Sequence, residues 1–174
     1  MPRRPLFYLF VSFLLTIPSC TRNVKIVPDT TDLPTTPTSD ILILPGGGPG
    51  SRTFATDKGV QSLIRSYRDA GKYVGVICAA TTALVSSVTS AAKTEGLESS
   101  KKVRVTSHPS VQEEVEQAGW EYSEERVCVD GKVVSSRGPG TAMGFALTIV
   151  ELLAGKEKRH EVHGPMIAAP PLRG

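Results

Sequence analysis

The sequence predicts an α/β fold in which a mostly parallel sheet is covered by helices on both faces. Short apolar runs rich in Val and Ile alternate along the chain with longer segments whose apolar residues have helical spacing. One late segment, residues 140–155, is apolar on nearly all sides, which is typical of a buried helix. Strands that alternate with helices indicate a parallel sheet with both faces covered.

Local signals mark where these elements begin and end. The first strand stops at Pro45 and three glycines, and Gly71 follows the first helical segment as a C-terminal stop. The dipeptide Asp130-Gly131 between two β-branched runs is a strong hairpin signal. Strands are therefore predicted at 40–45, 72–78 and 101–109 and in a hairpin at 126–136, and helices at 57–70, 79–89, 110–119 and 140–155.

Length and charge limit the class of protein. A chain of 174 residues with 40% apolar and 21% charged residues suits one soluble domain that buries its own core. The net charge is +3, and two of these charges lie at Arg3 and Arg4. We therefore expect neither a nucleic-acid-binding face nor stable association with a membrane.

The three cysteines, Cys20, Cys78 and Cys128, are widely spaced and form no CxxC pair. This pattern indicates neither a zinc site nor a disulfide framework, and it suits a reducing compartment. We expect no metal and no cofactor.

The first nineteen residues disagree with a reducing compartment. A basic start is followed by a mostly apolar stretch from Leu6 to Ile17 and then by small residues, as in a secretory signal. The stretch is too short for a spanning helix. A buried strand or helix and a mispredicted start of an intracellular protein are the alternatives, and we expect the last. Residues 1–19 are accordingly set apart from a domain at 20–170.

The thiol of Cys78 lies at the carboxyl end of a predicted strand and at the start of a predicted helix. Ligands of open α/β sheets bind at this edge, and a helix N-terminus favours an anion there. A sharp strand-to-helix turn of this kind is the geometry of a nucleophile elbow. The alternative is a small buried apolar side chain, as most free cysteines are.

A nucleophile needs a proton partner and donors for developing negative charge. His108 follows a predicted strand and can face the same edge as Cys78, whereas His160 and His163 are expected to be solvent-exposed. The glycine loop "LPGGGPG" (44–50) offers backbone N–H groups to an oxyanion. A phosphate loop and a dinucleotide fingerprint at 136–144 are weaker alternatives, because no GK[ST] follows the first and no βα unit precedes the second.

Four stretches of the chain are informative together, namely "LPGGGPG", "VICAATTALV", "VTSHPSVQ" and "YSEERVCVDGKVVSSRGPGTAMGFALTIVELLAGKE". They resemble the ThiJ/PfpI superfamily, in the branch of the parkinsonism-associated deglycase (the DJ-one branch) and glyoxalase III, also called D-lactate dehydratase. The resemblance runs from about Cys20 to Ala169 and implies a flavodoxin-like sandwich similar to class I glutamine amidotransferases.

The resemblance also assigns site residues. Cys78 matches the reactive cysteine of the family, and His108 matches the histidine beside it. Backbone N–H groups of Gly47 and Ala79 match the oxyanion pocket. Arg22 matches an arginine near the pocket, and Pro139 matches a proline that the partner subunit of a homodimer brings close to it.

The activity implied is conversion of methylglyoxal, a small 2-oxoaldehyde, to lactate through a hemithioacetal on Cys78, without a cofactor. Deglycation is a further implied activity. The alternative is a noncatalytic redox sensor or chaperone of the oxidative-stress response that uses oxidation of Cys78. A glutaminase is the weakest interpretation, because Ser110 stands where its triad needs an acid.

The sequence departs from the family pattern in two ways. Ala80 replaces a glycine, which would strain the turn if that residue had a positive φ. No counterpart of the family's opening strand–helix–strand unit, with its glutamate bonded to the cysteine, is found before Cys20. We therefore expect an incomplete fold in the written sequence. The expected compartment is the cytoplasm, with the nucleus as a second location and secretion as the alternative if the leader is real.

Overall fold

The structure is a computed structural model that describes residues 24–30, 32–91 and 100–168. Within these residues a four-stranded sheet has the order β1-β2-β4-β3. β1 (Ile41–Leu44), β2 (Tyr73–Ile77) and β4 (Val133–Ser136) are parallel, and β3 (Val127–Asp130) pairs with β4 in the antiparallel direction. The prediction of an α/β fold with a mostly parallel sheet is confirmed.

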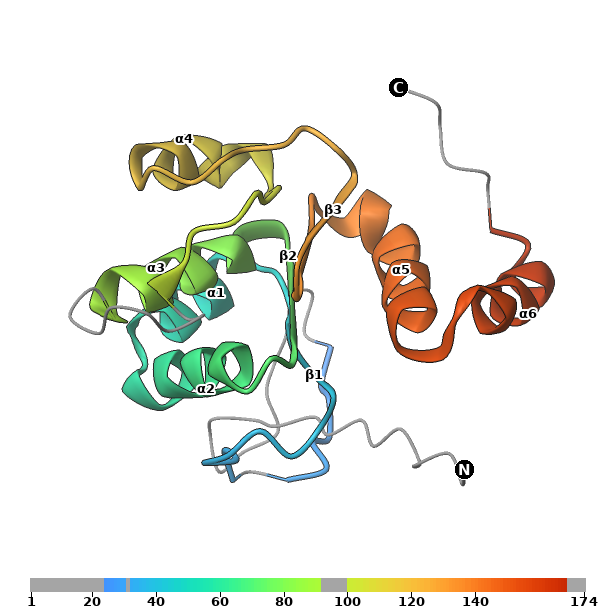
Figure 1. Cartoon of the computed structure of the whole chain (residues 1–174), viewed down its shortest axis with the longest axis horizontal. Helices are drawn as coiled ribbons and strands as arrows, with labels where there is room; N and C mark the ends of the chain where they lie inside the picture. Colours follow the sequence, from blue (N-terminus) through green and yellow to red (C-terminus); the bar gives the residue numbers. More distant parts are fainter. Residues whose placement is uncertain (1–23, 31, 92–99, 169–174) are drawn as a thin grey trace.

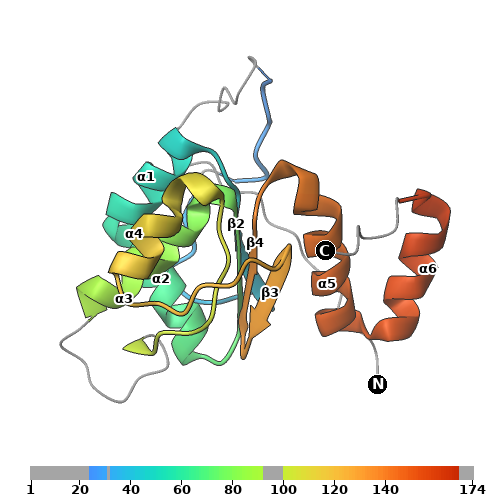
Figure 2. The ribbon, with the colours of Figure 1, turned by 90° about the horizontal axis from the view of Figure 1, so that it is seen from above.

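Helices cover both faces of the sheet, as Figures 1 and 2 show. The layer on one face contains α1 (Gly48–Thr56), α2 (Lys58–Asp69), α3 (Thr81–Ala91) and α4 (Gln112–Gln117). The other face carries α5 (Ala142–Ala154) and α6 (Lys156–Met166). Three short 3-10 turns, η2 (Cys78–Ala80), η4 (Pro109–Val111) and η5 (Pro139–Thr141), each precede a helix directly.

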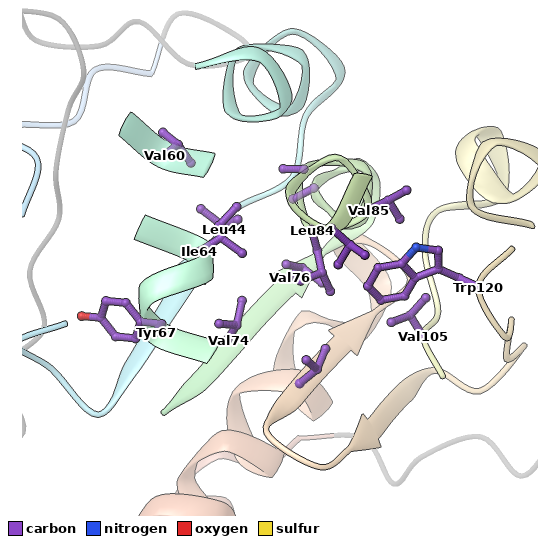
Figure 3. Close-up of a cluster of buried hydrophobic side chains, with 14 of the residues drawn as sticks. Leu44, Val60, Ile64, Tyr67, Val74, Val76, Leu84, Val85, Val105 and Trp120 are labelled. Carbon is purple, nitrogen blue, oxygen red and sulfur yellow. The ribbon is translucent and has the colours of Figure 1, made fainter. Parts of the chain in front are cut away.

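The main core lies between the sheet and the helices α2 and α3 (Figure 3). Helix α2 begins where the Asp57 carboxylate accepts a hydrogen bond from the Val60 N–H at 2.9 Å, and it buries the apolar face that its spacing predicts. The central strand β2 is buried on this face through Val74 and Val76. Buried side chains labelled in Figure 3 include Leu44, Val60, Ile64, Tyr67, Val74, Val76, Leu84, Val85, Val105 and Trp120.

Helix α5 is only partly buried, contrary to the prediction of a helix buried on nearly all sides. Phe145, Leu147 and Ile149 are buried, whereas the side chain of Met143 is 51% exposed. The reason is its place in the outer layer, where one face meets the sheet and α6 packs beside it. Phe145 packs on Gly75 of β2, where a Cβ would lie 3.0 Å from the ring.

No strand forms in the segment 101–109, whose last residue Pro109 already begins η4, which corrects the sequence prediction. Its single backbone bridge joins Val105 to Tyr122. The Arg104 and Thr106 N–H groups instead donate to side chains of the β3–β4 hairpin, to Asp130 Oδ2 at 2.8 Å and to Ser135 Oγ at 2.9 Å. Side-chain acceptors thus replace the carbonyl ladder that defines a strand.

Two helices were not predicted. Residues 48–56 form α1 although they include two glycines and a proline, since Pro49 lies in the first turn, where its missing N–H costs nothing. The polar stretch after Gly155 forms α6. In the part of the chain that the structure describes, no helix is long and apolar enough to cross a bilayer.

Candidate active site

Three parallel strands end at the edge of the sheet where the site lies. Leu44 of β1 is in register with Val76 of β2, and Ile77 is in register with Ser136 of β4. Beyond these strand ends, the glycine loop after β1, the residues after β2 and the turn after β4 all lie at the same edge of the sheet. This is the edge at which open α/β sheets bind ligands.

Cys78 is the residue at which the chain leaves β2 and turns toward α3. It follows β2 immediately, begins the turn η2 that leads into α3, and has a φ of 65°. Only two residues other than glycine have a positive φ in the described part of the chain, and the other, Ile167, lies just after α6. The thiol is free and half-buried. The predicted strand-to-helix elbow is therefore present, with the strained residue at the cysteine itself.

Ala80, where the family pattern has glycine, does not carry the strain. It is buried as the last residue of η2, and its φ is not positive. Alanine is therefore compatible with this turn.

Gly46 packs directly on the cysteine. A Cβ placed on Gly46 would stand 2.5 Å from Cys78 Cβ, 3.0 Å from the Ile77 carbonyl oxygen and 3.2 Å from Cys78 Sγ. The register of β1 and β2 explains the contact, because two residues beyond the pair Leu44 and Val76 come Gly46 and Cys78. This role of Gly46 was not predicted from the sequence, although the matched ends of two parallel strands indicate it.

Gly47 and Ala79, the two residues assigned to an oxyanion pocket, lie at helix starts. Gly47 is the N-cap of α1 with a φ of 108°, and Ala79 is the second residue of η2. The first N–H groups of a helix have no acceptor within it, and the oxyanion role that the resemblance gives these two residues stays a prediction. Gly47 is exposed and Ala79 is buried.

His108 is tied to the cysteine through the backbone. Its N–H donates to the Cys78 carbonyl oxygen at 3.2 Å, and the half-buried ring caps η4. On the ring, Nδ1 lies 2.8 Å from Ser110 Oγ and accepts a hydrogen bond from the Ser110 N–H at 3.2 Å. The other two histidines lie on α6, where His160 is exposed as predicted and His163 is half-buried.

A hollow of about 390 Å³ opens beside His108. Gly138 and Pro139, which follow β4, form part of its wall, and Cys78 is not among the residues that line it. Pro139 is thus placed beside His108 within one chain, and its contribution to a partner's site stays a prediction. The hollow is lined by His108, Pro109, Glu124, Arg126, Arg137, Gly138, Pro139, Gly140 and Thr141.

The arginine that the resemblance assigns near the pocket stays a prediction. Arg22 lies outside the described residues. Arg126 and Arg137 line the hollow, and each donates to a backbone carbonyl, that of Gly140 for Arg126 and that of Glu124 for Arg137. In the described ranges no group of three or more His, Cys, Asp or Glu side chains is arranged to hold a metal ion.

The second internal cysteine is of a different kind. Cys128 on β3 is fully buried, and its Sγ lies 3.5 Å from the Arg104 carbonyl oxygen. Burial raises the pKa of this thiol above its ordinary value, and the nearby Arg104 guanidinium opposes that shift. Cys128 is therefore a structural residue.

The sheet, the glycine loop and the strained cysteine define a class of α/β proteins that present a thiol at a nucleophile elbow. Comparison with known proteins identifies the family, since the model of the DJ-1/PfpI family matches residues 11–152. The chain belongs to the DJ-1/PfpI family, and its resemblance to the DJ-1 branch is confirmed.

Relatives of known sequence are similar over most of the chain. A Schizosaccharomyces pombe protein named glutathione-independent glyoxalase DJ-1 is 36% identical over 143 residues, which cover 82% of this chain and 68% of that protein. Protein dj-1beta of Drosophila melanogaster is 38% identical over 86% of this chain and 75% of its own length. Glutathione-independent glyoxalase DJR-1.2 of Caenorhabditis elegans is 34% identical with the same two coverages.

Solved structures have the same fold. The crystal structure of Drosophila melanogaster DJ-1beta matches with a TM-score of 0.73 and 34% identity, over 87% of this chain and 77% of that one. Schizosaccharomyces pombe DJ-1 matches with a TM-score of 0.74 and 29% identity, over 88% and 78%.

Proposed function

We propose that this protein is a glyoxalase that needs no glutathione and converts methylglyoxal to lactate through Cys78. The observation that carries the proposal is the position of the thiol, which stands on a positive-φ turn between a strand and a helix, with two helix N-termini beside it. Two relatives from different organisms are named glutathione-independent glyoxalases, which supports the same reaction.

The first step is addition of the Cys78 thiolate to the aldehyde carbon. The sulfur–carbon bond forms, and the carbonyl π electrons move to oxygen, which becomes an alkoxide. The N–H groups of Gly47 and Ala79 stabilise that charge, each by about 10²–10³ in rate. Protonation of the alkoxide gives the hemithioacetal.

The second step moves hydrogen between the two carbons. The proton on the former aldehyde carbon is removed, and a proton is added to the former ketone carbon, which gives a thioester of lactate on Cys78. Water then attacks the thioester, the sulfur–carbon bond breaks, and lactate and the free thiol are released. One carbon is oxidised as its neighbour is reduced, so no external oxidant or reductant is needed. One methylglyoxal and one water contain the atoms of one lactic acid. We assign His108 to assist this step, because its backbone N–H donates to the Cys78 carbonyl oxygen and holds it beside the cysteine.

Lactate formation from methylglyoxal in the absence of glutathione tests the proposal. We expect Cys78→Ser to abolish turnover and His108→Gln to lower kcat by about 10²-fold or more. His160→Gln is the matched control, because His160 is exposed on α6 away from the elbow, and it should retain parental activity. A Cys78→Ser variant as active as the parent would refute the proposal.

A redox sensor is the second candidate, favoured by a free, half-exposed thiol at a strained turn. In this function Cys78 is oxidised by peroxide to the sulfinic acid, a gain of two oxygen atoms or about 32 Da. Peptide mass spectrometry after mild peroxide treatment distinguishes the two. Oxidation of Cys78 without any methylglyoxal turnover favours the sensor, and an unmodified Cys78 excludes it.

A further inference from the structure

The hydrogen bonds on His108 determine which of its ring nitrogens carries the proton. The Ser110 N–H can only donate, and it lies 3.2 Å from Nδ1 in bonding geometry. Nδ1 must therefore be the acceptor and bear no proton, so the neutral ring carries its proton on Nε2. The Ser110 hydroxyl, 2.8 Å from the same nitrogen, can add a second donor.

This arrangement is the reverse of a catalytic triad. In a triad a carboxylate accepts a hydrogen bond from Nδ1–H, which leaves Nε2 unprotonated so that it can act as a base. Here a donor occupies that place, so Nε2 carries a hydrogen. In the described part of the chain no residue forms a hydrogen bond with Nε2. Gly138 lies beside the ring, and a Cβ placed on it would be 3.5 Å from His108 Cδ2.

We propose that Ser110 is a positioning residue that holds His108 in the Nε2–H tautomer, so that His108 acts on the substrate as a hydrogen-bond donor. The inference rests on the proposed glyoxalase function. In that reaction Nε2–H donates to the ketone oxygen of the hemithioacetal and stabilises the enediolate that forms when the neighbouring carbon loses its proton to water. A neutral imidazole can polarise a carbonyl in this way without itself accepting a proton.

The tautomer is measured directly by two-bond nitrogen–proton correlation spectra of the full chain labelled with ¹⁵N-histidine. His108→Gln assigns the signals. We expect the parent to show the pattern of Nε2–H. Ser110→Asp keeps the backbone N–H but replaces the hydroxyl with a carboxylate acceptor beside Nδ1, which should compete with that N–H and move His108 toward the Nδ1–H tautomer. Ser110→Thr keeps both donors and should keep the parental pattern. Because Ser110 is exposed, neither change disturbs the core.

Kinetics provide a second readout. Ser110→Asp should lower kcat for methylglyoxal by about tenfold or more with little change in KM, because the donated bond strengthens in the transition state, and Ser110→Thr should restore kcat. A parent in the Nδ1–H form overturns the inference, and a Ser110→Asp variant with an unchanged tautomer overturns the role given to the Ser110 side chain. A parent that converts no methylglyoxal overturns the proposed function instead, and the spectra of the resting protein distinguish the two failures.

Discussion

Gly46 and Cys78 are in contact across the ends of two parallel strands, so closely that a Cβ on Gly46 would lie 2.5 Å from Cys78 Cβ. The contact places the glycine loop against the elbow and leaves no room for a side chain between them. The loop and the thiol therefore form one structural unit, and a substitution in one should displace the other.

Gly46→Ala should destabilise the protein by about 1–3 kcal/mol, because the new methyl group meets backbone and Cβ atoms that cannot rotate away. The displaced elbow should also lower methylglyoxal turnover by about 10²-fold. Gly50→Ala is the matched control, since open space surrounds it in α1 and alanine favours a helix by about 1 kcal/mol. Urea unfolding of the two variants measures the difference. Equal stabilities would mean that the contact is looser than the structure has it.

Replacement of Cys78 should reveal the free-energy cost of its positive-φ backbone conformation. A residue with a side chain at a φ of 65° is strained, and glycine is not, so Cys78→Gly should be more stable than Cys78→Ala by about 1 kcal/mol. Both variants lack the thiol and should be inactive, which separates stability from chemistry. Midpoints of urea unfolding provide the comparison. If Cys78→Ala were the more stable of the pair, the turn would not be strained.

Cys78 and Cys128 should differ in reactivity. In the native protein iodoacetamide should modify Cys78 and leave the fully buried Cys128 unmodified, whereas in urea both should react, as peptide mass spectrometry can establish. The pKa of Cys128 is higher in the fold than the ordinary 9.0, so the folded state binds this proton more tightly than the unfolded chain does.

The contribution of Cys128 to stability is therefore complete below pH 9.0 and is lost as pH rises through its folded pKa. In the parent the urea midpoint of unfolding should fall as the pH is raised from below 9.0 to above 9.0. A smaller fall in Cys128→Ala would assign the effect to this thiol, and an identical fall would contradict it.

Ser135→Ala tests the side-chain bonds that hold the segment before His108. The Ser135 hydroxyl accepts from the Thr106 N–H, and both residues are fully buried. Its removal leaves a buried N–H without this acceptor and should cost about 1–3 kcal/mol. Ser66→Ala is the control, because that hydroxyl only donates to the Leu63 carbonyl of its own helix, and its loss should change stability by about 0.5 kcal/mol or less. Equal losses in the two variants would show that Ser135 does not hold the segment.

Local pattern was sufficient for most of the fold. The strands at 41–44 and 73–77, the 127–136 hairpin and the helices over 58–69 and 142–154 follow from apolar spacing and turn residues in the chain itself. The place of Cys78, at the end of one element and the start of the next, is likewise a property of adjacent residues. For this reason the sequence by itself determined the fold class and the candidate nucleophile.

Tertiary structure decided the features that depend on residues far apart in the chain. Strand register brings Gly46 to Cys78, hairpin side chains keep 101–109 from forming a strand, and the outer position of α5 exposes Met143. The bond between Ser110 and the His108 ring depends on a turn that no periodicity predicts. Periodicity records which residues avoid water, whereas register and hydrogen-bond direction are set only when distant elements pack together.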